Sequence, residues 1–142
     1  MWTHGTSVQI QDKAWETKAF REGHSTRVIP SGDNNVGWLH FAIPTPVMVD
    51  DPPLKAQSAL LRFGAGPQAS IIHFQVFHGI HKDAIYDQKV NYTNKDHPIE
   101  VPLTKQPVII GGIDISIQVL FTETAPKIAY IDLIGAGIRF SS

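Results

Sequence analysis

The sequence has 142 residues, which is the length of one domain with its own hydrophobic core. With 12 basic and 13 acidic side chains the formal net charge is −1, so no field of one sign attracts nucleic acid or an anionic membrane. The absence of cysteine excludes disulfides, thiolate catalysis and cysteine-ligated zinc. No apolar run reaches the length of a membrane span and no signal peptide opens the chain, so we expect a soluble, cytoplasmic protein.

The 10 prolines and 11 glycines are spread along the sequence and separate many short segments. This spacing is typical of all-β sandwiches and barrels. Residues 14–22 are the nearest candidate for a helix, but threonine and aromatic residues make that stretch ambiguous. We therefore predict a single all-β domain over residues 1–142, an antiparallel, jelly-roll-like β-sandwich of roughly eight to ten strands.

The expected strands follow in chain order between these breaks. They cover 6–11, 14–21, 24–29, 36–43, 47–49, 55–63, 70–78, 99–103, 113–121, 127–134 and 138–140. Residues 87–97 read as a loop that encloses a short strand at 90–92, and Pro102 suits an edge strand. The glycines of Gly135-Ala136-Gly137 predict a bulge or a bend before the last strand.

The strand at 36–43 is the best bounded, because it ends abruptly at Pro44-Thr45-Pro46. Alternation puts Trp38 and His40 on one face and the apolar residues Leu39, Phe41 and Ile43 on the other. The apolar face is predicted to be core. A tryptophan beside a histidine is unusual for a face that only meets water.

Several other strands share this property of one apolar face and one face with polar and aromatic groups. If these strands lie in one sheet, the second faces form a surface that can stack on a ligand and hydrogen-bond to it. Such a surface suits a carbohydrate or another small polar molecule, as in a lectin. The candidate ligand-binding residues are Trp38, His40, Arg62, His73, Gln75, Asp114, Tyr130 and Asp132.

Two alternatives stay open for the same surface. First, a solvated sheet face carries the same residue types without a ligand. Second, such a face suits a contact between subunits, and we expect the protein to form a homo-oligomer. The pair of Trp38 and His40 favours a functional surface, because an exposed tryptophan is costly on a plain one.

Catalysis is the other alternative, as an isomerase, cyclase or lyase. His40 or His73 beside Asp114 or Asp132 would form a general acid–base pair, with Tyr130 as a phenol donor. The candidate catalytic residues are therefore His40, His73 and Asp132. The sequence has no nucleophile elbow, phosphate-binding loop or dinucleotide fingerprint, and these patterns name no reaction.

Seven histidines raise the question of a metal site. His73 and His78 point to opposite faces of one predicted strand, and His81 follows a turn. No His-x-His or His-Glu-x-x-His pattern is present. We expect no metal site and no cofactor.

Three segments are distinctive in order and spacing: His4-Gly5, the block Trp38-Leu39-His40-Phe41-Ala42-Ile43-Pro44-Thr45-Pro46, and Gly135-Ala136-Gly137-Ile138-Arg139-Phe140. Together they resemble a family of small, uncharacterised bacterial β-sandwich proteins, a domain of unknown function. Phe74-Gln75-Val76-Phe77-His78-Gly79 is similar too, although the family tends to an acidic residue where His78 stands. The resemblance implies a stand-alone sandwich and gives weight to Trp38, His40 and 44–46, but it implies no reaction. A more distant similarity of layout to small oligomeric β-sandwich lectins is an analogy.

Overall fold

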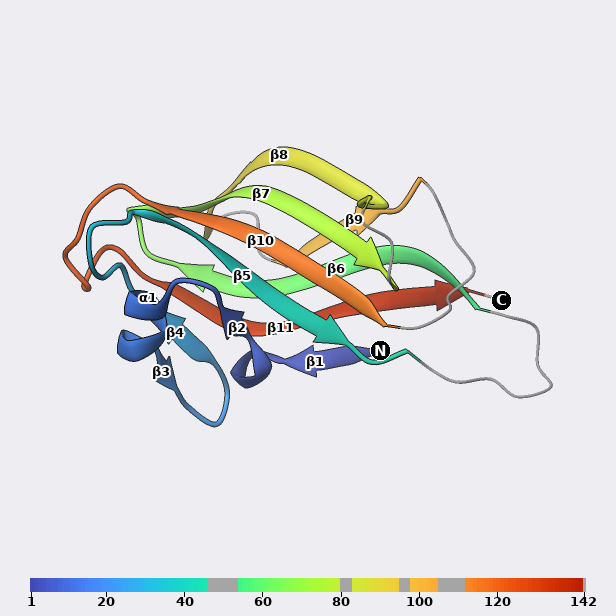
Figure 1. The fold of residues 1–142 in the computed structure, drawn as a ribbon, viewed down its shortest axis with the longest axis horizontal. Helices are drawn as coiled ribbons and strands as arrows, with labels where there is room; N and C mark the ends of the chain where they lie inside the picture. Colours follow the sequence, from blue (N-terminus) through green and yellow to red (C-terminus); the bar gives the residue numbers. More distant parts are fainter. Residues whose placement is uncertain (46–53, 80–82, 95–97, 105–111, 142) are drawn as a thin grey trace.

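A computed structural model describes residues 1–45, 54–79, 83–94, 98–104 and 112–141. In this part of the chain two antiparallel sheets pack face to face, with β5, β10 and β7 lying across β6 and β11 in Figure 1. Sheet A contains β1 (Trp2–His4), β3 (Phe20–Arg21), β4 (Thr26–Val28), β6 (Lys55–Ala65), β9 (Ile99–Pro102) and β11 (Ile131–Ser141). Sheet B contains β2 (Gln9–Ile10), β5 (Val36–Ile43), β7 (Ala69–His78), β8 (Tyr86–Tyr92) and β10 (Ile113–Phe121). Between the first strands lie a 3₁₀ turn, η1 (Gly5–Ser7), and the helix α1 (Lys13–Lys18).

The strand order is β3-β4-β11-β6-β9 in sheet A, where β1 also pairs with β11, and β2-β5-β10-β7-β8 in sheet B. This architecture confirms the predicted all-β antiparallel sandwich. The described residues hold 11 strands, slightly more than predicted, because β1, β2 and β3 are short pairings of two or three residues. The edge position predicted from Pro102 is confirmed, since β9 is the last strand of sheet A.

The core lies between the two sheets and follows the predicted alternation. Leu39, Phe41 and Ile43 of β5 are buried, and the inward residues of β6, β10 and β11 are buried in the same way. Burial of these large apolar side chains supplies the main driving force for folding, at about 25 cal/mol per Å². The outer faces of both sheets carry the polar side chains.

The strand predicted at 14–21 is wrong, because these residues contain the helix α1. Asp12 caps the helix: its Oδ1 accepts hydrogen bonds from the backbone N–H groups of Ala14 at 2.9 Å and Trp15 at 3.2 Å. A hydrogen bond from the Asn34 side chain, followed by these backbone bonds, lowers the pKa of Asp12. The helix buries only one large side chain, the indole of Trp15, which packs edge-on against Phe121 with ring centroids 5.0 Å apart.

The predictions for other segments also need correction. The strands predicted at 127–134 and 138–140 form one strand, β11, which begins at Ile131. A loop enclosing a short strand at 90–92 was expected for 87–97, yet the strand β8 begins already at Tyr86 and forms the edge of sheet B beside β7. Asp87 and Lys89 lie on the outer face beside Gln75 and His73, while Tyr86 and Tyr92 pack edge-on against Phe74. The strand expected at 6–11 shrinks to β2, because η1 takes its first residues. The strand predicted at 47–49, and His81, lie outside the described residues.

Two of the β-bulges in the described strands bear on the predicted faces. In β7, Val119 of the neighbouring strand pairs with Ile71 and Gln118 pairs with His73, so Ile72 is an extra residue. Ile71 therefore faces the core, contrary to the predicted alternation, while His73 faces outward. The second bulge lies before Gly135 in β11, where the glycines predicted it.

Candidate ligand-binding site

Five of the eight candidate ligand-binding residues lie on the outer face of sheet B. The strand β10 pairs with β5 on one side and with β7 on the other, so residues distant in sequence become neighbours. We call this surface the Trp38 face. Its residues are Trp38, His40, His73, Gln75, Asp87, Asp114, Ser116 and Gln118.

The register arranges the Trp38 face in rows across the strands. One row places Trp38 beside Gln118, and Gln118 beside His73. The side chains of directly paired residues on one face lie about 5 Å apart, which is close enough for one small ligand to touch several of them. The antiparallel pairing of three adjacent strands therefore brings these side chains together.

Trp38 and His73 form an aromatic pair at one side of this face. Their ring centroids are 5.3 Å apart and their planes are inclined by 48°. Nε2 of His73 is hydrogen-bonded to Oδ1 of Asp87, and Nε2 of Gln75 donates to the same oxygen at 3.3 Å. These bonds, that of His73 first, lower the pKa of Asp87, so the carboxylate is charged at neutral pH. Nε2 of His73 therefore carries the proton, and Nδ1 has no hydrogen bond to a described residue.

His40 belongs to a different hydrogen-bond chain on the same face. Ser116 Oγ donates to Oδ2 of Asp114 at 2.6 Å, and Nδ1 of His40 lies 2.7 Å from Ser116 Oγ. Because the serine proton goes to the aspartate, Nδ1 is the donor to the serine oxygen. Nε2 of His40 is 2.9 Å from Oε1 of Gln11.

The order of the three groups in this hydrogen-bond chain decides what chemistry it can perform. In a nucleophilic triad the histidine lies between the acid and the serine and removes the serine proton. Here Ser116 lies between His40 and Asp114, and its proton is already directed to the carboxylate. Ser116 is also buried. The chain therefore holds His40 in place and does not activate a nucleophile.

The other three candidates lie on the outer face of sheet A, on the opposite side of the sandwich. Asp132 accepts two hydrogen bonds from Arg27, at 2.7 and 2.9 Å, and this guanidinium lies 4.2 Å from the ring centroid of Tyr130. Arg62 lies over the indole of Trp2. The structure therefore does not bring Asp132 or Tyr130 together with His40 or His73.

Sequence reasoning missed Asp87 of the Trp38 face and Gln11, which lies beside that face, as site residues. Asp87 had been assigned to a loop, and only the pairing of β8 with β7 brings it to His73. Gln11, which contacts His40, lies just beyond β2. By contrast, Ser116 and Gln118 lie opposite the apolar positions in the clearest alternation of the sequence, and this pattern places them on the same polar face as Asp114.

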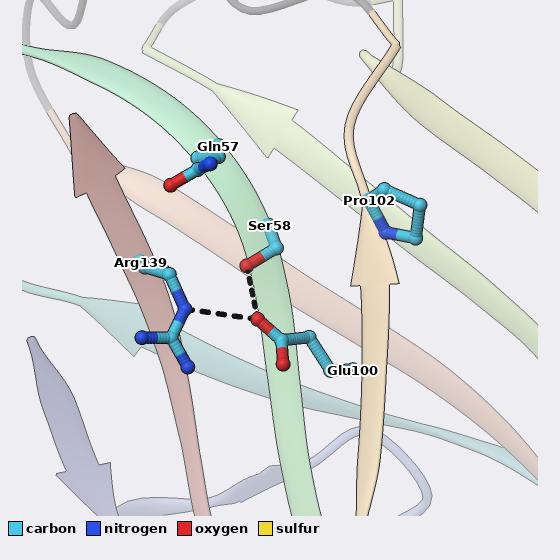
Figure 2. A pocket seen from close by; sticks show the side chains of 5 residues that line it. All are labelled: Gln57, Ser58, Glu100, Pro102 and Arg139. Carbon is cyan, nitrogen blue, oxygen red and sulfur yellow. Dashed lines mark hydrogen bonds and ion pairs between the residues drawn. The ribbon is translucent and has the colours of Figure 1, made fainter.

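Sheet A carries hollows of its own on its outer face. One of about 450 Å³ lies between β6, β9 and β11 and is lined by Gln57, Ser58, Glu100, Pro102 and Arg139 (Figure 2). Glu100 Oε1 accepts hydrogen bonds from Ser58 Oγ at 2.7 Å and from Arg139 Nε at 2.9 Å. These bonds, that of Ser58 first, lower the pKa of Glu100. The carboxylate and the guanidinium of this hollow thus already bind each other.

In the part of the chain that the structure describes, no group of three or more histidine, aspartate or glutamate side chains is placed to hold a metal ion. The described helices are also too short and too polar to cross a membrane.

The comparison with protein families gives a match over the whole chain. The model of a family of unknown function, DUF6623, matches residues 1–142. The chain belongs to DUF6623. This membership agrees with the resemblance predicted from the sequence, and the family description names no activity. A comparison with curated proteins finds no match.

Proposed function

We propose that the Trp38 face binds a small polar ligand, and that a carbohydrate is the class it suits best. The observation that carries this proposal is the pair of Trp38 and His73, with hydrogen-bonding groups beside it on adjacent strands. The rings of Trp38 and His73 are only partly exposed, so each offers surface to a ligand while its neighbours hold it in place. An aromatic surface flanked by fixed polar groups is the usual construction of a sugar-binding site.

The polar groups of this face complement a sugar hydroxyl in three ways. The charged carboxylate of Asp87 accepts a hydrogen bond, the amide of Gln118 donates or accepts one, and the neutral form of His73 accepts one at Nδ1. The bonds that His73 and Gln75 make to Asp87 keep that carboxylate in place. Groups fixed before binding lose little conformational entropy when the ligand arrives.

A glycan array followed by calorimetry on the best sugar tests this proposal. We expect Trp38→Ala to weaken binding by about tenfold or more, because stacking on the indole is lost. Trp2→Ala is the matched control, since Trp2 is also exposed but lies on sheet A, and it should leave the affinity unchanged. The absence of binding to any sugar, or full affinity in Trp38→Ala, would refute the proposal.

An acid–base enzyme on the same face is the alternative, and the pair of His73 and Asp87 favours it. A carboxylate that holds one ring nitrogen leaves the other to exchange a proton with a bound substrate. This alternative predicts that the double variant His40→Ala, His73→Ala is inactive on any substrate turned over by the wild type. Retained turnover in that variant would exclude it.

We also expect the protein to form a homo-oligomer, and the partly exposed aromatic surface of the Trp38 face would suit a subunit contact. Light scattering of the wild type and of Trp38→Glu tests this expectation. An oligomer that Trp38→Glu dissociates would assign the face to subunit contact and would count against a sugar site there.

A further inference from the structure

A second hollow on sheet A surrounds the indole of Trp2 at the start of the chain. It has a volume of about 330 Å³ and is lined by Trp2, Thr3, His4, Arg62, Ile134 and Gly135. It lies on the opposite sheet from the Trp38 face, so the two surfaces are separate. Its volume is sufficient for a small organic molecule.

The glycines of β11 explain why the indole of Trp2 can lie here. β1 pairs with β11, with Trp2 opposite Gly137. A Cβ atom at Gly137 would lie 2.8 Å from Cδ2 of Trp2, which is too close for two carbon atoms. At Gly135 it would lie 3.6 Å from Cε3. The indole therefore covers two residues without side chains and lies directly against the sheet.

Arg62 places a positive charge over this ring. Its guanidinium carbon is 5.1 Å from the centroid of the Trp2 ring. Arg27 and Arg139 on the same face each donate to a carboxylate. Arg62, in contrast, has no hydrogen bond or ion pair with any described residue. All five of its N–H donors are thus available to a ligand.

His4 supplies a second donor to the same hollow. Its Nδ1 accepts a hydrogen bond from the backbone N–H of Thr6 at 3.1 Å. In the neutral ring the proton therefore lies on Nε2, and no described residue accepts it. Arg62 and His4 thus give the hollow two hydrogen-bond-donating side chains and a positive charge, with no carboxylate among its lining residues.

The remaining lining is apolar and exposed. Trp2 is 46% exposed and Ile134 is 38% exposed, whereas large apolar side chains elsewhere in the two sheets are mostly buried. We propose that this hollow binds a small carboxylic acid with an apolar body. The carboxylate accepts hydrogen bonds from the planar fork of Arg62 and from His4, and the apolar body covers Trp2 and Ile134.

Indole N–H resonances test this inference, because the three tryptophans report on three places. Trp2 reports on this hollow, Trp38 on the opposite face and Trp15 on the core. In ¹⁵N-labelled protein titrated with sodium benzoate to about 10 mM, we expect a saturable shift of the Trp2 resonance alone. Benzyl alcohol lacks the charge and acetate lacks the ring, so each should bind at least about threefold more weakly.

Two variants identify the anion-binding group. Arg62→Gln should weaken benzoate binding by about tenfold, while Arg139→Gln on the same face should leave it unchanged. Any of three results would overturn the inference: no saturable shift of the Trp2 resonance, a shift confined to the Trp38 resonance, or full benzoate affinity in Arg62→Gln. Since benzoate at Trp2 and sugar at Trp38 are read from different resonances, failure of one proposal does not decide the other.

Discussion

The contact between Gly37 and Trp15 lies directly behind the Trp38 face, and replacing Gly37 by alanine tests it. A Cβ atom at Gly37 would lie 2.6 Å from Cζ3 and 2.8 Å from Cη2 of Trp15. Carbon atoms in van der Waals contact are about 3.5–4.0 Å apart, so the indole or β5 must move by about 1 Å. Trp15 is fully buried and has no free space to enter. We expect Gly37→Ala to lower the free energy of unfolding by about 2 kcal/mol.

A double-mutant cycle shows whether Trp15 is the cause. Trp15→Leu removes the ring atoms in question, the hydrogen bond from Nε1 to the Asn34 carbonyl at 3.2 Å and the contact with Phe121. This change alone should cost about 3 kcal/mol. In its background the alanine methyl at position 37 enters vacated space and should cost almost nothing. The expected coupling energy is therefore about 2 kcal/mol.

Urea unfolding followed by far-UV circular dichroism measures all four proteins, since tryptophan fluorescence would change with Trp15. Gly23→Ala is the control, because a Cβ atom there meets no atom within 4 Å. The contact would be refuted if the double variant loses as much stability as the two single variants together, within about 0.5 kcal/mol. A Gly37→Ala variant as stable as the wild type would refute it as well.

Two further predictions concern stability. The pKa of Asp87 is lowered first by its bond to His73 and then by its bond to Gln75. These bonds therefore add to the free energy of unfolding above the usual aspartate pKa of about 4, and this stability is lost as the pH falls through the lowered pKa of the folded state. Because the Asp87 side chain is 54% exposed, Asp87→Asn should cost less than about 1 kcal/mol at pH 7, and this cost should shrink as the pH falls below about 4, measured by urea unfolding across that range. Gly5→Ala should lower the free energy of unfolding by about 3 kcal/mol, because its Cβ would lie 1.8 Å from the carbonyl oxygen of Leu133. The melting temperature should fall strongly as a result. An unchanged melting temperature would contradict that close approach.

The core could be predicted from the sequence because its signal is local. In 36–43 and 113–121, every second residue is apolar, and the structure buries those residues. The helix α1 gave no such signal, since it is six residues long and buries only Trp15. Only residues 90–92 of the strand β8 were predicted, because most of its other residues are polar and its place depends on pairing with β7.

The candidate site could be predicted only in part, because strand order is a non-local property. Trp38 and His73 come from strands that both neighbour β10, so the expected convergence holds for them. Arg62 and Asp132 are polar residues on equally clear strands. Their strands, β6 and β11, nevertheless belong to the other sheet. Alternation assigns a face to each side chain, but it does not say which sheet that face belongs to.

The extra residue Ile72 makes β7 tolerant of a change in length. In a regular strand, gaining or losing one residue turns every later side chain to the opposite face. Deleting Ile72 would instead restore an unbroken ladder with β10, with Ile71 still directed inward and His73 still directed outward, while the register shift against the edge strand β8 would grow. Homologues one residue shorter here can therefore share the same interior and the same exposed histidine, whereas a single deletion in β10 would exchange interior for surface.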